Sequence, residues 1–133
     1  MRWEGTYPPE EKCCSAARHA CADGLCDAGV SAELFEIVVL VLGELVANAV
    51  RHACTDFTAA IELSPTWLRV EVFDAGARPP VLVRAGSHAT SGRGLNIVSE
   101  LSTDWGWDAG PRDGVKGKTV WAGFALEHHG TAI

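Results

Sequence analysis

Three polar residues recur at four-residue intervals within an otherwise apolar segment: Glu44, Asn48 and His52. Four residues advance an α-helix by about 400°, so on a helix these side chains form one stripe that drifts by about 40° per step. Burying such polar groups is costly unless they are satisfied or face a cavity, so the stripe is either a polar edge in contact with water or part of a site.

A metallohydrolase that uses the stripe as metal ligands is a further interpretation. On a helix, Glu44 and His52 lie about 12 Å apart along the axis, which is too far for all three residues to share one ion comfortably. The His-Glu-x-x-His pattern of zinc proteases is also absent from the sequence. We therefore disfavour a metallohydrolase.

The motif Asp74-Ala75-Gly76 ends a segment with strand-like alternation. A carboxylate in this place can accept hydrogen bonds from a ligand, and the glycine lets that ligand approach the backbone. Asp and Gly also commonly mark an ordinary turn, so the tripeptide alone does not distinguish a binding site from a turn.

A second glycine motif, Ser91-Gly92-Arg93-Gly94-Leu95, ends a long loop and begins a predicted helix. Its glycines can turn backbone N–H groups inward, and the N-terminus of a helix attracts anions such as phosphate. The sequence has no Walker motif, and the glycines lack the strand and the spacing of a Rossmann fold. P-loop and dinucleotide-binding folds are therefore disfavoured.

Two helices are predicted for the first half of the chain. The first follows Pro8-Pro9 and ends at Gly29, and the second runs from an N-cap at Ser31 to about Ala53. The second helix is apolar over most of its circumference, which is typical of a helix buried in the middle of a domain. Apolar positions of the first helix recur at helical spacing: Cys14, Ala17, Cys21 and Leu25.

The second half of the chain is predicted to be mainly β. Two β-rich segments joined by the turn 64–66 predict a hairpin, and residues 75–92 predict a long loop of the kind that serves as a lid or binding loop. The predicted elements are strands at Phe57 to Leu63, Trp67 to Phe73, Thr103 to Asp108 and Lys118 to Leu126, a helix at Gly94 to Leu101, and a turn at Gly110 to Gly117. This order predicts an α+β fold, a two-layer α/β sandwich with helices on one face of a mostly antiparallel mixed sheet.

Length and charge limit the class of protein. The sequence of 133 residues predicts one domain over its whole length, and its 11 basic and 17 acidic residues leave a net charge of −6. A chain this acidic is a poor candidate for binding nucleic acid or a membrane surface. The longest uncharged apolar run, Ile37 to Gly43, is far shorter than the about 20 residues that cross a bilayer, and the N-terminus does not resemble a signal peptide. We expect a cytoplasmic protein.

The five cysteines are an odd number, and four of them crowd between Cys13 and Cys26 without a Cys-x-x-Cys pair. A secreted disulfide scaffold and a zinc ribbon are therefore both disfavoured. We expect the cysteines to pack as small hydrophobic side chains on a helix. A redox role for the adjacent Cys13 and Cys14 is the alternative.

The motifs together, in this order and spacing, resemble those of the GHKL ATPases, the superfamily that includes gyrase and the histidine kinases. The segment Glu44 to His52 resembles the N box, Asp74 to Gly76 the first glycine box, and Gly92 to Leu95 the second. The segment Gly117 to Trp121 is similar to the closing strand of one branch, the small bacterial anti-sigma factors and serine/threonine protein kinases of partner switching. The likeness runs from about residue 29 to 124.

This resemblance implies a role for each motif residue. Asp74 would accept a hydrogen bond from the adenine amino group, Gly76 would allow close approach, and Thr119 would complete the contact through its hydroxyl. Asn48 would hold Mg²⁺ through its amide oxygen, and Glu44 would be the general base or would position the attacking hydroxyl. The ATP-binding loop would comprise Gly92, Arg93, Gly94 and Leu95, with residues 77–91 as the lid.

The resemblance implies an ATP-binding regulatory protein of the anti-sigma factor type. Its expected activity is that of a serine/threonine protein kinase that uses ATP and Mg²⁺ to phosphorylate an anti-sigma factor antagonist. One alternative is a non-catalytic ATP-binding module that sequesters its partner. A second is the detached catalytic domain of a histidine kinase, although nothing before residue 30 resembles a dimerising helix pair with a phosphoacceptor histidine. The expected partners are a sigma factor, an antagonist protein or both, and a homodimer is left open.

Three features qualify the resemblance. Gly43 precedes Glu44 where many relatives carry serine, and a glycine inside a helix costs about 1 kcal/mol relative to alanine. The N-terminal helix, usually part of the sigma or dimer surface in this branch, is rich in Cys and Ala. His52, at the end of the N box, is expected to be supporting structure rather than a catalyst.

Overall fold

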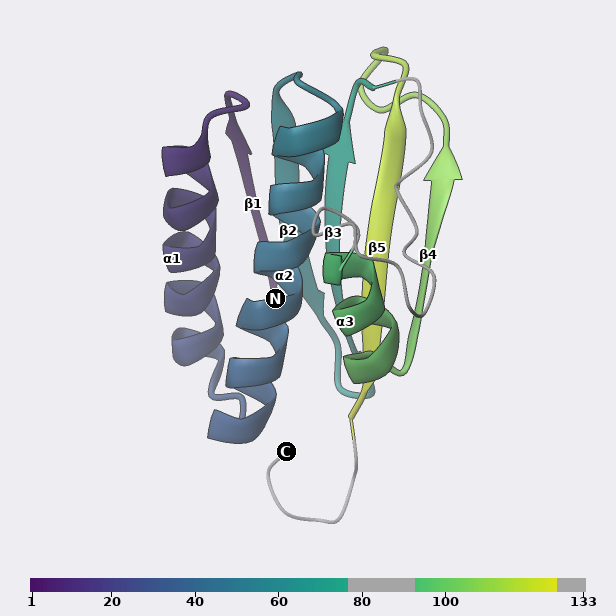
Figure 1. The fold of residues 1–133 in the computed structure, drawn as a ribbon. Helices are drawn as coiled ribbons and strands as arrows, with labels where there is room; N and C mark the ends of the chain where they lie inside the picture. Colours follow the sequence, from purple (N-terminus) through teal and green to yellow (C-terminus); the bar gives the residue numbers. More distant parts are fainter. Residues whose placement is uncertain (77–92, 127–133) are drawn as a thin grey trace.

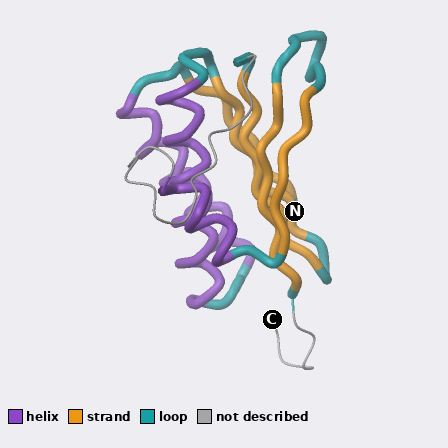
Figure 2. The backbone as a smooth tube through the Cα atoms, turned by 45° about the vertical axis from the view of Figure 1, so that its right-hand side comes forward, coloured by secondary structure: helices purple, strands orange, loops and turns teal. Residues whose placement is uncertain are grey.

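The computed structural model describes residues 1–76 and 93–126. Within these ranges, helices cover one face of a five-stranded sheet and leave the other face without a helix (Figures 1 and 2). The elements in chain order are β1 (Arg2–Tyr7), α1 (Glu11–Ala28), α2 (Ala32–His52), β2 (Phe57–Leu63), β3 (Trp67–Asp74), α3 (Arg93–Leu101), β4 (Asp104–Ala109) and β5 (Lys118–Ala125). The predicted α+β two-layer sandwich is confirmed.

The strand order is β1-β2-β3-β5-β4, and each neighbouring pair of these strands is antiparallel. The expectation of a mixed sheet is therefore wrong for the described strands. A parallel neighbour requires a crossover connection. The connection that contains α3 joins β3 to β4, which is the edge strand of the sheet. β5 lies between β3 and β4 and is antiparallel to both, so β3 and β4 are not neighbours.

The boundaries of the two long helices agree with the prediction. Gly29 caps the end of α1 with a φ of 75°, a left-handed conformation that glycine adopts without steric cost. Ser31 caps the start of α2, and its hydroxyl accepts a hydrogen bond of 3.2 Å from the backbone N–H of Leu34. The two caps set the tight connection between α1 and α2.

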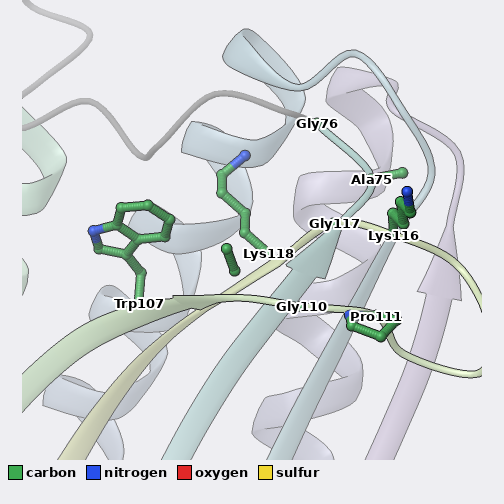
Figure 3. Close-up of a pocket in the computed structure, with 9 residues that line it drawn as sticks. Ala75, Gly76, Trp107, Gly110, Pro111, Lys116, Gly117 and Lys118 are labelled. Atoms are coloured by element: carbon green, nitrogen blue, oxygen red, sulfur yellow. The ribbon is translucent and has the colours of Figure 1, made fainter.

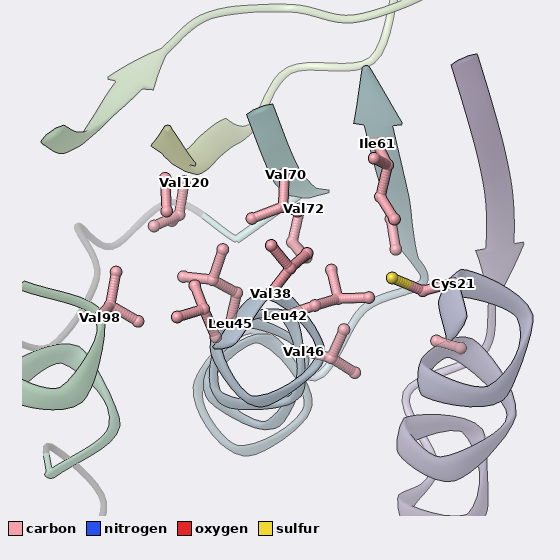
Figure 4. Packing of buried hydrophobic residues seen from close by; sticks show 14 of the residues in the cluster. Cys21, Val38, Leu42, Leu45, Val46, Ile61, Val70, Val72, Val98 and Val120 are labelled. Atoms are coloured by element: carbon pink, nitrogen blue, oxygen red, sulfur yellow. The ribbon is translucent and has the colours of Figure 1, made fainter. Parts of the chain in front are cut away.

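The core lies between the sheet and α2, the middle helix of the layer (Figure 4). The residues of α2 that contribute to it include Val38, Val41, Leu42, Leu45 and Val46, and the strand residues facing them include Ile61, Val70, Val72 and Val120. All of these side chains are almost completely removed from solvent. This burial holds α2, and with it the polar stripe, over the middle of the sheet.

The cysteines are all free, and they divide into two groups. Cys13 and Cys21 are buried, as expected for small hydrophobic side chains, and burial raises the pKa of Cys21 to about 12. Cys14 is half-buried, whereas Cys26 and Cys54 are exposed, so the expectation of burial is wrong for these two.

β1 is an edge strand that the sequence pattern did not lead us to expect. It pairs antiparallel with β2, with Trp3 opposite Ile61 and Tyr7 opposite Phe57. The rings of Tyr7 and Phe57 stack with their centroids 5.5 Å apart. The strand has only six residues, and Gly5 takes a position on the helix-facing side, so the apolar alternation is interrupted.

The two hairpins close as expected. The Ser64 N–H donates to the Trp67 carbonyl at 2.9 Å, and the Gly110 N–H donates to the Gly117 carbonyl at 2.9 Å. The long loop predicted at residues 75–92 lies outside the described residues from position 77 onward. Among the described residues, none of the helices combines the length and the hydrophobicity of a membrane span.

Two tryptophans lie against glycines on the helix-free face of the sheet. A Cβ added at Gly123 would overlap the Trp67 ring, and one added at Gly106 would lie 3.0 Å from a ring carbon of Trp121. The Arg69 guanidinium lies over the Trp121 ring, 4.7 Å from its centroid. Both glycines therefore serve close approach of an indole ring to the sheet.

Candidate functional site

The polar stripe on α2 is real, and its middle member is the most deeply buried. Asn48 is 6% exposed, whereas Glu44 and His52 are half-buried. Asn48 Oδ1 and His52 Nε2 are buried without a hydrogen-bond partner in the part of the chain that the structure describes. An unsatisfied buried polar atom costs about 1–3 kcal/mol, so these two atoms mark a place where a ligand would offset that cost.

The orphaned amide oxygen of Asn48 fits the role of a magnesium ligand. Mg²⁺ prefers hard oxygen ligands and is usually held by one or two protein groups together with substrate phosphates. Within the described residues, no group of three or more His, Cys, Asp and Glu side chains could hold a metal ion. A cation at Asn48 would therefore depend on ligand oxygens in addition to those of the protein.

Glu44 faces a cavity between α1 and α2. The cavity has a volume of about 520 Å³, and residues lining it besides Glu44 include Arg18, Glu36, Gly43 and Arg51. The Arg18 side chain packs against α2 at Gly43, where an added Cβ would lie 3.5 Å from Arg18 Cδ. That distance is an ordinary van der Waals contact, so Arg18 packs on Gly43 without requiring glycine there.

Asp74 lies at the end of β3 and is 1% exposed. Its Oδ1 accepts a hydrogen bond of 2.8 Å from the Gly76 N–H. The same oxygen accepts a charge-assisted hydrogen bond of 2.7 Å from Nζ of Lys118, which is itself 5% exposed. Asp74 and Lys118 lie directly opposite each other in the register of β3 and β5.

Lys118 was not among the residues expected at this site. Its position beside Thr119 is the one feature of the sequence that could have pointed to Lys118. The strand register is what places the lysine against Asp74. Successive side chains of a strand point to opposite faces of the sheet. Lys118 and Val120 face the helices, so Thr119 lies on the helix-free face, opposite Phe73. The expected contact of Thr119 with the base that Asp74 would bind is therefore wrong.

Gly76 and Gly117 allow the chain to pass close to Asp74. A Cβ added at Gly76 would lie 2.9 Å from Asp74 Oδ1 and 3.0 Å from the Cβ of Ala53, which follows α2. A Cβ added at Gly117 would overlap the backbone carbonyl oxygen of Asp74. Glycine at both positions brings the end of α2 and the start of β5 together around the carboxylate.

A second cavity, of about 410 Å³, is lined by Gly76 and Lys118, the two residues that donate hydrogen bonds to this carboxylate (Figure 3). Cavities of this size accommodate small-molecule ligands. Trp107 on β4 and Lys118 on β5 rise from the same side of the sheet and line it. The other lining residues are Ala75, Gly76, Ala109, Gly110, Pro111, Lys116 and Gly117. Trp107 is 38% exposed, and no motif in the sequence predicted it as a site residue.

The second glycine motif is described only in part. Gly92 and the predicted lid lie outside the described residues. Arg93, Gly94 and Leu95 form the first turn of α3, which packs beside α2 on the same face of the sheet (Figure 1). The fold therefore places α3, which begins with the described part of this motif, next to the helix that carries Glu44 and Asn48.

Comparison with known families and structures identifies the class. The family model described as "Histidine kinase-like ATPase domain" matches residues 7–124. The protein belongs to this family, and the expected membership of the GHKL superfamily is confirmed.

The crystal structure of the SiaB-SiaC complex from Pseudomonas aeruginosa contains a chain with a similar fold, at a TM-score of 0.62 and 15% sequence identity. The similarity covers 93% of the present chain and 89% of that chain. At this identity the likeness concerns the fold alone. No curated protein matches the sequence.

Proposed function

We propose that this ATPase-family domain binds Mg-ATP and regulates a protein partner in the cytoplasm, as a serine/threonine kinase of the anti-sigma factor type. The observation that carries the proposal is the Oδ1 of Asn48 on α2, which is buried and has no hydrogen-bond partner among residues 1–76 and 93–126. It is a hard oxygen in the N box, on the helix whose end packs against the Asp74 and Gly76 motif.

In this proposal each motif has a separate task. Asp74 and Gly76 bind the nucleotide base, and the N-terminal turn of α3 with Arg93 binds the phosphates through N–H groups and positive charge. Asn48 is the protein ligand of Mg²⁺. When bound, the ion neutralises charge on the phosphates.

Glu44 supplies the general base. It takes the proton of a serine or threonine hydroxyl on the partner as the hydroxyl oxygen forms a bond to the γ-phosphorus. The bond between the γ-phosphorus and the β–γ bridging oxygen breaks, and ADP leaves. The expected protein substrate is an anti-sigma factor antagonist. A protein partner is supported by the similar fold from Pseudomonas aeruginosa, which was crystallised as a complex of SiaB with SiaC.

A non-catalytic module that binds ATP and sequesters its partner is the second candidate. It is favoured by the position of Glu44, which lines the cavity between α1 and α2, whereas Lys118 and Gly76 line a different cavity. Transfer of labelled γ-phosphate to a purified antagonist protein separates the two functions, because a sequestering module binds ATP but labels nothing.

The binding of Mg-ATP itself is tested with Asn48→Ala. Calorimetric titration with ATP is carried out in excess Mg²⁺ and again in EDTA. We expect the substitution to weaken ATP binding at least tenfold in Mg²⁺ and by much less in EDTA, because only the metal-dependent part of the affinity requires the amide oxygen. Equal losses in both buffers would mean that Asn48 is a packing residue and would contradict the proposed metal ligand.

A further inference from the structure

Lys118 is the charged residue of the candidate site to which the motif series assigns no role. It is the first residue of β5, it is 5% exposed, and its Nζ lies 2.7 Å from Asp74 Oδ1. Lysine is almost never buried this deeply unless its charge is paired. Lys118 also lines the cavity of about 410 Å³ together with Gly76.

The ammonium group has hydrogen-bonding capacity beyond Asp74. It carries three N–H donors, and one of them is used on Asp74 Oδ1. The opposite charges of the pair largely cancel, so the site offers the ligand directional hydrogen bonds rather than a free charge. Lys118, a donor that lines the cavity, therefore lies directly beside an acceptor, Asp74, which is almost completely buried and does not line the cavity itself.

The donor of Lys118 and the acceptor of Asp74 are complementary to one edge of adenine. That edge offers the 6-amino group as a donor next to the ring nitrogen N1 as an acceptor. We propose that Lys118 is a specificity-determining residue of the nucleotide site, which donates to N1 of the base while Asp74 accepts from the 6-amino group. This inference rests on the proposed function, because it requires that the cavity binds the base of ATP.

Trp107 makes the cavity suitable for a flat ring. Its indole rises from β4 beside Lys118 and stays 38% exposed along the wall (Figure 3). An aromatic side chain at the wall of a cavity stacks on a nucleobase without regard to the identity of the base. In this arrangement Trp107 contributes affinity for any base, whereas Lys118 and Asp74 read the edge.

The test replaces one atom of the ligand. In 1-deaza-ATP a C–H group stands in place of N1, so the acceptor is lost while the 6-amino group and the phosphates remain. Calorimetric titration in Mg²⁺ compares ATP with 1-deaza-ATP for the wild type, Lys118→Met and Lys118→Gln. Lys116→Met is the matched control, because Lys116 lines the same cavity but is exposed.

We expect the wild type and Lys116→Met to bind 1-deaza-ATP about 10- to 100-fold more weakly than ATP, the range for a hydrogen bond to a charged group. Lys118→Met should bind both ligands equally, and Lys118→Gln, which keeps a donor, should retain part of the discrimination. If Lys118→Met does not fold, the ratio in the wild type and its reduction in Lys118→Gln decide the question.

The two hypotheses fail in different ways. If the folded wild type binds no Mg-ATP, the proposed function fails and the inference fails with it. If the wild type binds ATP and 1-deaza-ATP equally, the inference is overturned and the proposed function stands. If Lys118→Met weakens both ligands by the same factor and keeps their ratio, Lys118 supports Asp74 or contacts phosphate, and its role in reading the base is likewise overturned.

Discussion

Gly76 and Ala53 are in contact so close that a Cβ added at Gly76 would lie 3.0 Å from the Cβ of Ala53. Ala53 follows the helix that carries Asn48, and Gly76 follows the strand that ends in Asp74. The contact therefore joins the element proposed to hold Mg²⁺ to the element proposed to bind the base. A change at this point should affect both stability and nucleotide binding.

Gly76→Ala tests that relationship. The added methyl group would meet Ala53 and the Asp74 carboxylate, and such overpacking costs about 1–3 kcal/mol in the free energy of unfolding. We expect a lower melting temperature and at least tenfold weaker binding of Mg-ATP, measured by thermal denaturation and calorimetry. Gly24→Ala is the control, because a Cβ there would make only ordinary contacts with Trp3 and Met1. Unchanged ATP affinity in folded Gly76→Ala would show that the contact has no part in binding.

The buried pair of Asp74 and Lys118 predicts strong energetic coupling. Asp74→Asn leaves the Lys118 ammonium buried without its counter-charge, which typically costs about 3–5 kcal/mol. The double variant Asp74→Asn with Lys118→Met removes both charges and should be more stable than Asp74→Asn alone. Urea unfolding of the two single variants and the double variant measures the coupling. Additive losses would contradict a stabilising ion pair.

Glu44→Gln separates phosphotransfer from nucleotide binding. The amide keeps the shape of the side chain but cannot take a proton, and a positioned base contributes about 10²–10⁴-fold to the rate. We expect ATP affinity within a few-fold of the wild type and loss of nearly all transfer of labelled γ-phosphate to an antagonist protein. Glu36→Gln is the control, since Glu36 lines the same cavity. Wild-type transfer by Glu44→Gln would exclude Glu44 as the base.

Two glycine-to-alanine changes should have opposite effects on stability. Gly43 lies inside α2, and a Cβ there would make an ordinary contact with Arg18, so Gly43→Ala should stabilise the fold by up to about 1 kcal/mol. Gly123→Ala would drive a methyl group into the Trp67 ring and should destabilise by about 1–3 kcal/mol. Urea unfolding measures both changes. The same sign for both would contradict the packing described for one of them.

Cys21 predicts a loss of stability in alkaline solution. Burial raises the pKa of its thiol from 9.0 to about 12, so the folded state favours the protonated thiol. This contribution is complete below pH 9 and is lost as the pH rises toward 12, because the unfolded chain releases the proton first; the loss amounts to up to about 4 kcal/mol.

The measurement for Cys21 is urea unfolding between pH 8 and about 11 under reducing conditions. We expect the stability of the wild type to fall more steeply with pH than that of Cys21→Ala, which has no thiol to titrate. Cys26→Ala, at an exposed position, should keep the slope of the wild type. Parallel slopes for the wild type and Cys21→Ala would show that the thiol ionises as easily in the folded protein as in the unfolded chain.

Local structure and membership of the superfamily could be predicted from the sequence. The caps at Gly29 and Ser31, the apolar periodicity of α2 and the turns of both hairpins depend on residues close together in the chain, so their signals are present in short segments. The spacing of Glu44 and Asn48 likewise follows from the pitch of one helix. The membership of the superfamily rests on motifs of this local kind.

The side chains that meet across the sheet could not be predicted before the strands were paired. A shift of one residue in strand register exchanges the two faces, and nothing near Lys118 or Thr119 in the chain shows which of them faces Asp74. β1 and Trp107 were likewise not predicted. β1 depends on pairing with β2, which is distant in the sequence, and Trp107 is a site residue only because it lines a cavity. The register between β3 and β5 depends on burying all the apolar side chains on one face of the sheet together. No short segment of the sequence therefore identifies the residue that lies opposite Asp74.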